Sequence, residues 1–198
     1  MITNKSVLKR YLAMDRYALG KGGEKNKRPK LIGDYIYKFE ISLRYHEYYH
    51  NIISAGNRNL FNRLRLLWWK YWHNSLGLLL GFEVPINVFD AGLRINHKGL
   101  LIVNHHANIG KYCDIHQGVN IGVQGNSPTD CPTIGDNVWI GPGAKIFGKI
   151  TIGNNNQIGA NAVVNKSFTE NGIAIAGVPA KKISNNPNPY VRKYLIDK

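Results

Sequence analysis

The stretch IGDNVWIGPGAKIFGKITIGNNNQIGANAV, residues 134–163, decides the fold. It consists of successive six-residue units, each of which begins with isoleucine. Four positions later the residue is usually small or β-branched, as in Val138, Ala144 and Ala162, and the second position is often glycine. Self-similarity at a fixed short period is typical of a solenoid. The pattern predicts one short strand and one sharp corner per unit, with three units closing each triangular coil.

The same unit extends beyond this stretch in both directions. Further units begin at Ile109, Ile115 and Ile121 before it, and at Val164 after it. Thirteen residues instead of six separate Ile121 from Ile134, which leaves seven inserted residues. Because an insertion in a solenoid is extruded as a loop, often on the binding face, we expect a loop over 123–133. A series of ordinary short strands with glycine turns would not keep this strict register.

Residues 1–81 follow a different pattern, which is basic, aromatic and compatible with helices. The stretch TNKSVLKRYLAMDRYAL predicts a helix over 3–19, opened by a polar cap at Thr3 or Asn4. Glycine and proline predict a loop over 20–29, and two further helices are expected over 34–53 and 60–80. We therefore divide the chain into a helical segment, 1–81, a solenoid domain, 82–183, and a tail, 184–198.

The chain is strongly basic, with a formal net charge of +14. Most of this charge lies in residues 1–81, which suits an anionic cofactor, an acidic polysaccharide or anionic lipid. Nucleic acid is not expected as a partner, because no recognition motif accompanies the charge. The stretch FNRLRLLWWKYWHNSLGLLLGF, 61–82, is too interrupted by charge to span a bilayer. It predicts a helix that packs on the protein or on a neighbouring subunit, with peripheral membrane contact as the alternative.

The cysteines and the N-terminus indicate a cytoplasmic protein. Cys113 and Cys131 are too few for a disulfide framework and lack the spacing of a zinc site. The stretch MITNKSVLKRYLAMD is charged every few residues, so it contains no apolar segment of the kind a secretory signal needs.

Residues 82–183 resemble the hexapeptide-repeat acyltransferases, and among them the serine acetyltransferase-like proteins associated with surface-polysaccharide synthesis. The resemblance rests on the repeats, on GLRINHKGLLIVNHHANIGKYCDIHQGVNIG at 92–122, on the extruded loop and on the closing AGVPAKKI at 176–183. It implies a mainly β fold, a left-handed parallel β-helix with a short α-helical N-terminal segment. It also implies an acetyl-CoA-dependent O-acetyltransferase that assembles as a homotrimer, with the active site between subunits.

The resemblance assigns the catalytic residue. His97, in INHKG, matches the family's catalytic histidine, which as a general base would remove the proton of the acceptor hydroxyl. Asn96 stands where serine acetyltransferases carry an aspartate, so a sugar hydroxyl of a polysaccharide precursor is favoured as acceptor over L-serine. Serine O-acetyltransferase of cysteine biosynthesis is the alternative.

The extruded loop departs from the family pattern. It offers Asp130 and Cys131 in place of the usual basic pair. Either one of them takes a different role, or the site draws on His105, His106 or His116. We expect Asp130 and His116 to contact the acceptor together with Asn96. A covalent mechanism through the Cys131 thiolate is a further possibility, but direct transfer is preferred.

The resemblance and the small residues also suggest a path for the cofactor. An extended pantetheine arm can lie against the backbone where side chains are small. The residues expected along it are Gly143, Ala144, Ala160, Ala162 and Gly177, with Lys181, Lys182 and, with less support, Lys145 facing the phosphates of CoA. No metal is expected. A γ-class carbonic anhydrase using the four histidines between 97 and 116, and a non-catalytic trimeric scaffold, are the competing hypotheses.

Overall fold

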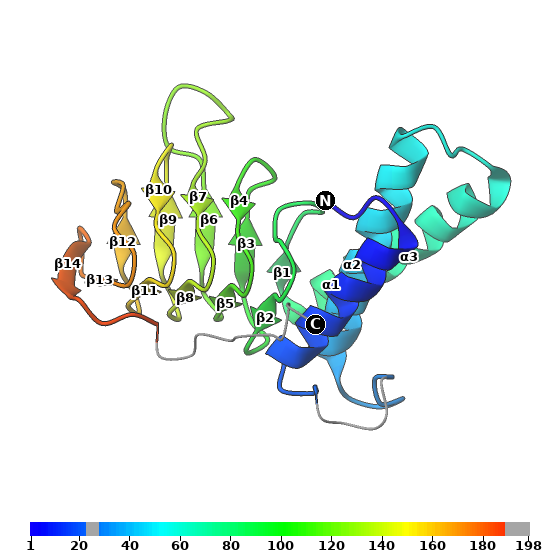
Figure 1. Ribbon diagram of the computed structural model, residues 1–198, viewed down its shortest axis with the longest axis horizontal. Coiled ribbons are helices and arrows are strands. Elements are labelled where there is room, and N and C mark those ends of the chain that lie inside the picture. The colour runs from blue at the N-terminus through cyan, green and yellow to red at the C-terminus, as the bar shows by residue number, and fades with distance from the viewer. Residues whose placement is uncertain (23–27, 189–198) are drawn as a thin grey trace.

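The computed structural model describes residues 1–22 and 28–188 (Figure 1). Three helices, α1 (Lys5–Ala18), α2 (Tyr35–Ser54) and α3 (Leu60–Leu80), come first. They are followed by short strands, β1 (Phe82–Glu83), β2 (Arg94–Ile95), β3 (Leu101–Val103), β4 (Asn108–Ile109), β5 (Asp114–Ile115), β6 (Asn120–Gly122), β7 (Thr133–Ile134), β8 (Trp139–Ile140), β9 (Lys145–Phe147), β10 (Thr151–Ile152), β11 (Gln157–Ile158), β12 (Val163–Val164), β13 (Ala174–Ala176) and β14 (Lys181–Ser184). Most of the tail lies outside the described residues.

The three helices lie where the sequence predicts them. Asn4 caps α1, because its side-chain oxygen accepts a hydrogen bond from the backbone N–H of Val7 at 3.0 Å. Gly81 ends α3 in a left-handed conformation, with a φ of 79°. The helices gather at the end of the molecule where the first strands begin, and the later strands follow in a row away from them (Figure 1).

The strands form three sheets around a triangular coil. Sheet A is ordered β1-β3-β6-β9-β12, sheet B β10-β7-β4, and sheet C β14-β13-β11-β8-β5-β2. All pairings are parallel except that between β13 and β14. Because successive strands from β2 to β12 enter sheets C, A and B in turn, each sheet supplies one side of the coil.

The register confirms the period and the insertion. Ile140 pairs with Ile158 and Ile146 with Val164, so one coil takes 18 residues. Ile121 pairs with Ile146, 25 residues later, because the coil between them contains the seven inserted residues. The chain from β6 to β7 extends well beyond the edge of the coil (Figure 1).

The predicted aliphatic ladder is the core of the coil. Its members, Ile109, Ile115, Ile121, Ile134, Ile140, Ile146, Ile152, Ile158 and Val164, are at most 2% exposed. The residues four positions later, Cys113, Val119, Val138, Ala144, Ile150 and Ala162, are buried as well. Phe39, Leu43, Leu76 and Leu80 of the helices join the same hydrophobic cluster. The helices thereby cover the open end of the apolar core.

The second-position glycines do not supply the left-handed backbone of the unit. The left-handed backbone falls at the fourth position of the unit, as in Asn137, Asn155 and Asn161, with φ between 56° and 59°. At the second position the constraint is space. A Cβ on Gly141 would lie 2.7 Å from the backbone nitrogen of Ala160 on the next coil. These glycines let the coils stack closely.

We name the three corners of the coil by the sheets that they connect. The C–A corner contains residues 96–100, 116–119, 141–144 and 159–162, and residues 177–180, between β13 and β14 of sheet C, continue it by hydrogen-bonding to Val163 of β12. The B–C corner contains 90–93, 110–113, 135–138, 153–156 and 169–173, and the A–B corner contains 104–107, 123–132, 148–150 and 165–167.

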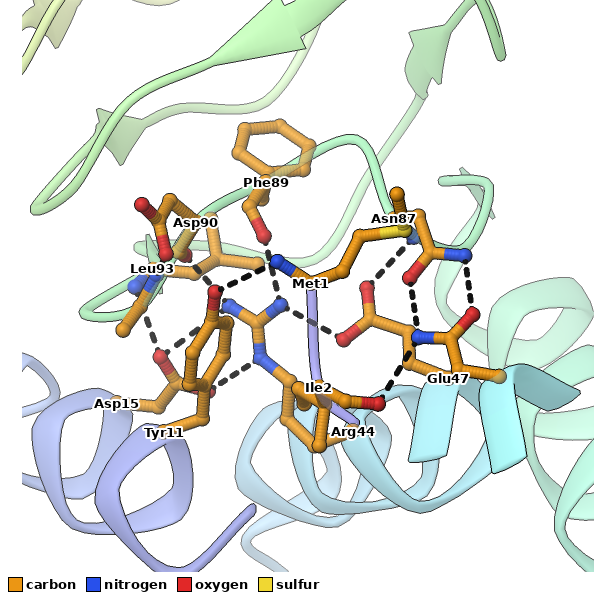
Figure 2. Close-up of polar contacts among 12 residues, drawn as sticks. Met1, Ile2, Tyr11, Asp15, Arg44, Glu47, Asn87, Phe89, Asp90 and Leu93 are labelled. Atoms are coloured by element: carbon orange, nitrogen blue, oxygen red, sulfur yellow. Dashed lines mark hydrogen bonds and ion pairs between the residues drawn. The ribbon is translucent and has the colours of Figure 1, made fainter. Parts of the chain in front are cut away.

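A buried ionic cluster attaches the helices to the first turn of the B–C corner (Figure 2). Arg44 is fully buried and pairs with Asp15 at 2.7 Å and with Glu47 at 3.0 Å. Its guanidinium also donates to the carbonyls of Phe89 and Asp90, both at 2.8 Å. Because every partner is buried or half-buried, the cluster fixes the geometry of docking.

Candidate functional site

Most of the predicted site residues lie on the C–A corner, distributed over successive coils. Asn96 and His97 follow β2, and His116 follows β5. The next coils bring Gly143 and Ala160 to the same corner, and Gly177 follows β13. Residues that span about 80 positions of sequence therefore form one line along the edge of the coil.

His97 is exposed and lies at a cavity. Its imidazole centroid is 6.2 Å from that of His116, and no described residue hydrogen-bonds to it. The cavity has a volume of about 370 Å³. Its walls come from the coil, through Asn96, His97 and Lys98, and from the helical segment, through residues that include Lys21 and Tyr35.

The helical segment supplies a charged wall that the sequence analysis missed. Asp34 lines the cavity in a left-handed conformation, with a φ of 50°. Its carboxylate accepts from the backbone N–H of Lys30 at 3.0 Å and lies 3.1 Å from the Lys21 ammonium. The Lys30 N–H and the Lys21 charge lower the pKa of Asp34. No sequence signal links these residues to His97, because the link depends on how the helices dock.

His116 is the better-oriented of the two histidines. Its Nδ1 lies 3.0 Å from the carbonyl oxygen of Ile140, which can only accept, so Nδ1 carries the proton. The ring also packs edge-on against Trp139, with centroids 4.9 Å apart. This tautomer leaves Nε2 as an acceptor of hydrogen bonds on the side away from Ile140.

Asn96 is held by a carboxylate from the next coil. Its side-chain amide donates a short hydrogen bond to Oδ1 of Asp114 and a longer one, 3.4 Å, to the carbonyl of Ile115. Arg94 donates to the other oxygen of Asp114 at 3.0 Å. The register of β2 with β5 places Arg94 opposite Asp114. Asp114 therefore orients the side chain of Asn96 at the site. The six-residue period places the two residues on neighbouring coils but does not show that their side chains touch.

Asp130 lies apart from His97 within one chain. It belongs to the extruded loop on the A–B corner, on the far side of sheet A from the C–A corner. Its carboxylate accepts from the backbone N–H of Ser127 at 3.3 Å, which helps to shape the loop. His105 and His106 occupy the same corner one coil earlier. Within one chain Asp130 and His116 lie on different corners, and their contact with one acceptor stays a prediction.

The two cysteines do not have the character of nucleophiles. Burial, with a smaller contribution from Asp130, raises the pKa of the Cys131 thiol. Burial raises the pKa of Cys113 well above its usual value, in keeping with its place in the core. A thiol with a raised pKa forms little thiolate at neutral pH, so the covalent alternative lacks support.

The residues predicted for the cofactor divide into two groups. Gly143 and Ala160 lie on the outside of the corner, but the side chains of Ala144 and Ala162 are fully buried inside the coil. For these two only the backbone can face a ligand, and their place along the cofactor path stays a prediction. The physical reason is the period itself, because the fifth position of each unit points inward.

The predicted lysines are not equally available to a ligand. Lys145 donates to the carbonyl of Gly118 at 2.6 Å, and Lys182 pairs with Glu170 at 2.6 Å. Lys181 and Gly177 are exposed. Within residues 1–22 and 28–188, no three His, Cys, Asp or Glu side chains cluster closely enough to hold a metal ion.

Residues 131–166 match the family described as bacterial transferase hexapeptide (six repeats). Residues 131–166 therefore carry this repeat, and the chain resembles serine acetyltransferases. It is 37% identical to the serine acetyltransferase of Synechococcus elongatus over 108 residues, covering 54% of this chain and 44% of that protein. It is 36% identical to that of Mycobacterium tuberculosis over 115 residues, 57% of this chain and 50% of the relative.

Solved structures show the same likeness over more of the chain. The serine acetyltransferase of Brucella abortus strain S19 in complex with coenzyme A matches with a TM-score of 0.68 and 25% identity. That match covers 92% of this chain and 70% of the other. The serine acetyltransferase of Neisseria gonorrhoeae matches with a TM-score of 0.66 and 26% identity over 91% and 66% of the two chains. The sequence matches span about half the length of the curated relatives.

Proposed function

We propose that this protein is an O-acetyltransferase that moves the acetyl group of acetyl-CoA to an acceptor hydroxyl, with His97 as the general base. The observation that carries the proposal is the placement of His97 on the C–A corner, exposed at a cavity of about 370 Å³. The Brucella relative that binds coenzyme A supports acetyl-CoA as the donor. The names of the sequence relatives support the reaction.

The proposed reaction is a direct transfer. The acceptor hydroxyl oxygen attacks the thioester carbonyl while His97 takes the hydroxyl proton, so a C–O bond forms as the proton leaves. The tetrahedral intermediate then expels the CoA sulfur, which leaves with the proton from the histidinium as free CoA. The Nε2 atom of His116, oriented by the contact of Nδ1 with Ile140, faces a bound ligand beside this step.

L-serine is now the favoured acceptor, in place of the sugar hydroxyl expected from the sequence. The relatives found by sequence are named serine acetyltransferases, and none of the comparisons supports a sugar. Asn96 is the observation that keeps the sugar as a second candidate. Its side-chain carbonyl oxygen can accept from a sugar hydroxyl, while its amide already donates to Asp114, which Arg94 also holds.

We further propose that the coil is left-handed and that the active form is a trimer. The C–A and A–B corners lie at opposite edges of sheet A, so Asp130 and His97 of one chain face different directions. A neighbouring copy that packs along the coil would bring its extruded loop to the C–A corner of the first. Acetyl-CoA would lie along that corner, with its pantetheine arm near Gly143 and Ala160 and its phosphates near Lys181.

The test is release of free CoA from acetyl-CoA by the purified protein. L-serine and a panel of nucleotide sugars are offered separately, and His97→Ala is assayed beside His50→Ala, which alters an exposed histidine on α2. We expect turnover on L-serine that is lost in the His97 variant and kept in the His50 variant. Turnover on a sugar alone would overturn the serine assignment, and activity untouched by His97→Ala would overturn the mechanism.

A further inference from the structure

The outer face of α3 is apolar and uncovered. Leu64 is 54% exposed, Trp68 58% and Tyr71 63%, although all three are large. The other exposed members are Leu60, Phe61, Leu67, Trp72, Leu78 and Leu79. At 3.6 residues per turn these positions share one side of the helix and run along its whole length, about 30 Å. We call this surface the α3 face.

The opposite side of α3 is fully engaged by the rest of the protein. Leu76 and Leu80 are buried in the common core. The Nδ1 atoms of His73 and His46 lie 2.9 Å apart, so one ring donates and the other accepts. Burial lowers the pKa of each to about 4, which keeps both neutral at neutral pH. The helix is therefore fixed on its inner side, and it cannot rotate to bury the α3 face.

Basic residues flank the α3 face on both sides. On the helix surface Arg63 and Lys70 lie along one edge of the apolar stripe and Arg65 along the other, and all three are exposed. The 21 residues of α3 contain no Asp or Glu. If a second copy of the chain packed on this face through its own α3 face, the basic residues of the two copies would lie close together and repel one another. The charge instead complements a partner that is apolar in its interior and anionic at its surface.

We propose that the α3 face binds the surface of an anionic lipid bilayer. Leucine and phenylalanine side chains enter the acyl region, tryptophan and tyrosine occupy the level of the headgroups, and the basic edges contact anionic headgroups. The helix lies in the plane of the interface, because no helix among the described residues is long and apolar enough to cross a membrane. The helical segment holds α3 at the end of the molecule away from the later strands (Figure 1).

A pocket beside the stripe adds apolar area to the same surface. It has a volume of about 380 Å³ and is lined by Trp68, Trp69 and Trp72 of α3, with Ile41 and Lys38 from α2 and Pro29 from the preceding loop. Lys38 Nζ donates to the carbonyl of Leu31 at 2.7 Å, and Leu31 and Ile32 are themselves highly exposed. Exposed apolar groups of this size on the same side of the helices are otherwise an aggregation liability.

The test is sedimentation of the full chain with vesicles. Vesicles of phosphatidylglycerol and phosphatidylcholine in equal amounts are compared with vesicles of phosphatidylcholine alone, at low and high salt. We expect at least tenfold tighter binding to the anionic vesicles, weakened by salt because the charge contribution is screened. No binding, or equal binding to both compositions, would overturn the proposal.

Two double variants and a matched control locate the binding surface. Leu64→Ser with Trp68→Ser removes exposed apolar groups, and Arg63→Glu with Lys70→Glu reverses the charge of one edge. Each should weaken binding at least tenfold. The control, Lys149→Glu with Lys166→Glu, makes the same change in net charge as the Arg63/Lys70 variant, but on exposed residues of the coil. It should change vesicle binding less than twofold. An equal loss in this control would show that net charge alone is responsible and would overturn the assignment to α3.

Sedimentation velocity without vesicles distinguishes the lipid surface from a second copy. If Leu64→Ser with Trp68→Ser produces a smaller assembly than the unmodified chain, the α3 face is a contact between copies and the proposal fails. Circular dichroism and thermal melting of each variant establish that the fold is kept, which is expected because the altered side chains are exposed. The vesicle result is independent of acetyl transfer, so it stands or falls separately from the proposed function.

Discussion

The B–C and C–A corners are built from the same six-residue unit but use their polar side chains differently. On the B–C corner Asp136, Asn154 and Asn171 form a ladder, in which each side chain accepts a backbone N–H from the preceding coil at 2.7–2.8 Å. On the C–A corner the corresponding third positions hold His97, Gln117, Pro142 and Ala160, and His116 stands at a second position. On the B–C corner the polar side chains accept hydrogen bonds from the backbone of that corner. On the C–A corner histidines are presented at a cavity. The repeat therefore sets the scaffold, while substitutions at one corner create the site.

The helical segment supports both corners through buried carboxylates. Asp15 accepts from the backbone N–H groups of Gly92 and Leu93 at the start of the B–C corner. Glu40 accepts from the N–H of Ile95, next to Asn96 and His97, at 3.1 Å. Substitutions at these contacts and on the B–C corner should change the free energy of unfolding. Substitutions of the exposed histidine on the C–A corner should change the rate of acetyl transfer.

The largest expected effect is on catalysis at the C–A corner. His97→Ala should lower kcat/KM by about 100- to 10,000-fold, the range typical of losing a general base. The free energy of unfolding should change little, because His97 is exposed and has no hydrogen bond within the described part of the chain. Steady-state CoA release and urea unfolding of the same preparation measure the two quantities. A comparable rate loss in Asn154→Ala would remove the functional distinction between the corners.

The next effect is on the docking of the helices at the B–C corner. Arg44→Met should lower the free energy of unfolding by about 3–5 kcal/mol, because Asp15 and Glu47 lose their buried partner. Urea unfolding at pH 7 measures the change. Arg63→Met, an exposed replacement of the same kind on α3, is the control and should stay within about 0.5 kcal/mol of the unmodified chain. Equal effects of the two variants would contradict the assigned role of the cluster.

Beneath the C–A corner, Glu40 gives the stability a pH dependence. Burial and the nearby Asp15 raise the pKa of Glu40 well above its usual value, and its Oε2 has no hydrogen-bond partner among the described residues. The unfolded state therefore releases this proton at lower pH than the folded state. The protonated side chain of Glu40 stabilises the folded state fully below the pKa that this group has in the unfolded state. This contribution is lost as the pH rises toward the pKa of Glu40 in the folded state.

Glu40→Gln should remove this dependence, because the amide keeps the acceptor for Ile95 and cannot ionise. The gain in unfolding free energy over the unmodified chain should grow from pH 5 upward by at most about 1.4 kcal/mol per pH unit. Urea unfolding at pH 5, 6, 7 and 8 provides the measurement. A difference that stays constant across this range would show that Glu40 is ionised in the folded state.

The smallest effect is expected within the ladder of the B–C corner. Asn154→Ala leaves the backbone N–H of Asp136 without its acceptor and should cost about 1–2 kcal/mol of unfolding free energy. Asn165→Ala, at an exposed asparagine on the A–B corner, is the matched control and should be close to neutral. The rate of CoA release should be unchanged in both. If both variants behave alike, the ladder does not stabilise the coil.

The sequence by itself determined the coil, the insertion and the three helices. Each of these depends on local regularities, such as isoleucine at every sixth position, a break in that spacing between Ile121 and Ile134, and a polar cap at Asn4. Such features are readable because a solenoid repeats the same short-range rule in every unit. The resemblance to acetyltransferases added His97, which no periodicity distinguishes from the other exposed histidines.

Only the tertiary structure decided what surrounds His97. Asp114 reaches Asn96 through the stacking of coils, Trp139 supports His116 from a third coil, and Lys21, Asp34 and Tyr35 close the cavity from the helical segment. The order of the sheets also separated Asp130 from the C–A corner. These relations join residues that are far apart in sequence, and they follow from inter-coil register and helix docking, which a six-residue pattern does not encode.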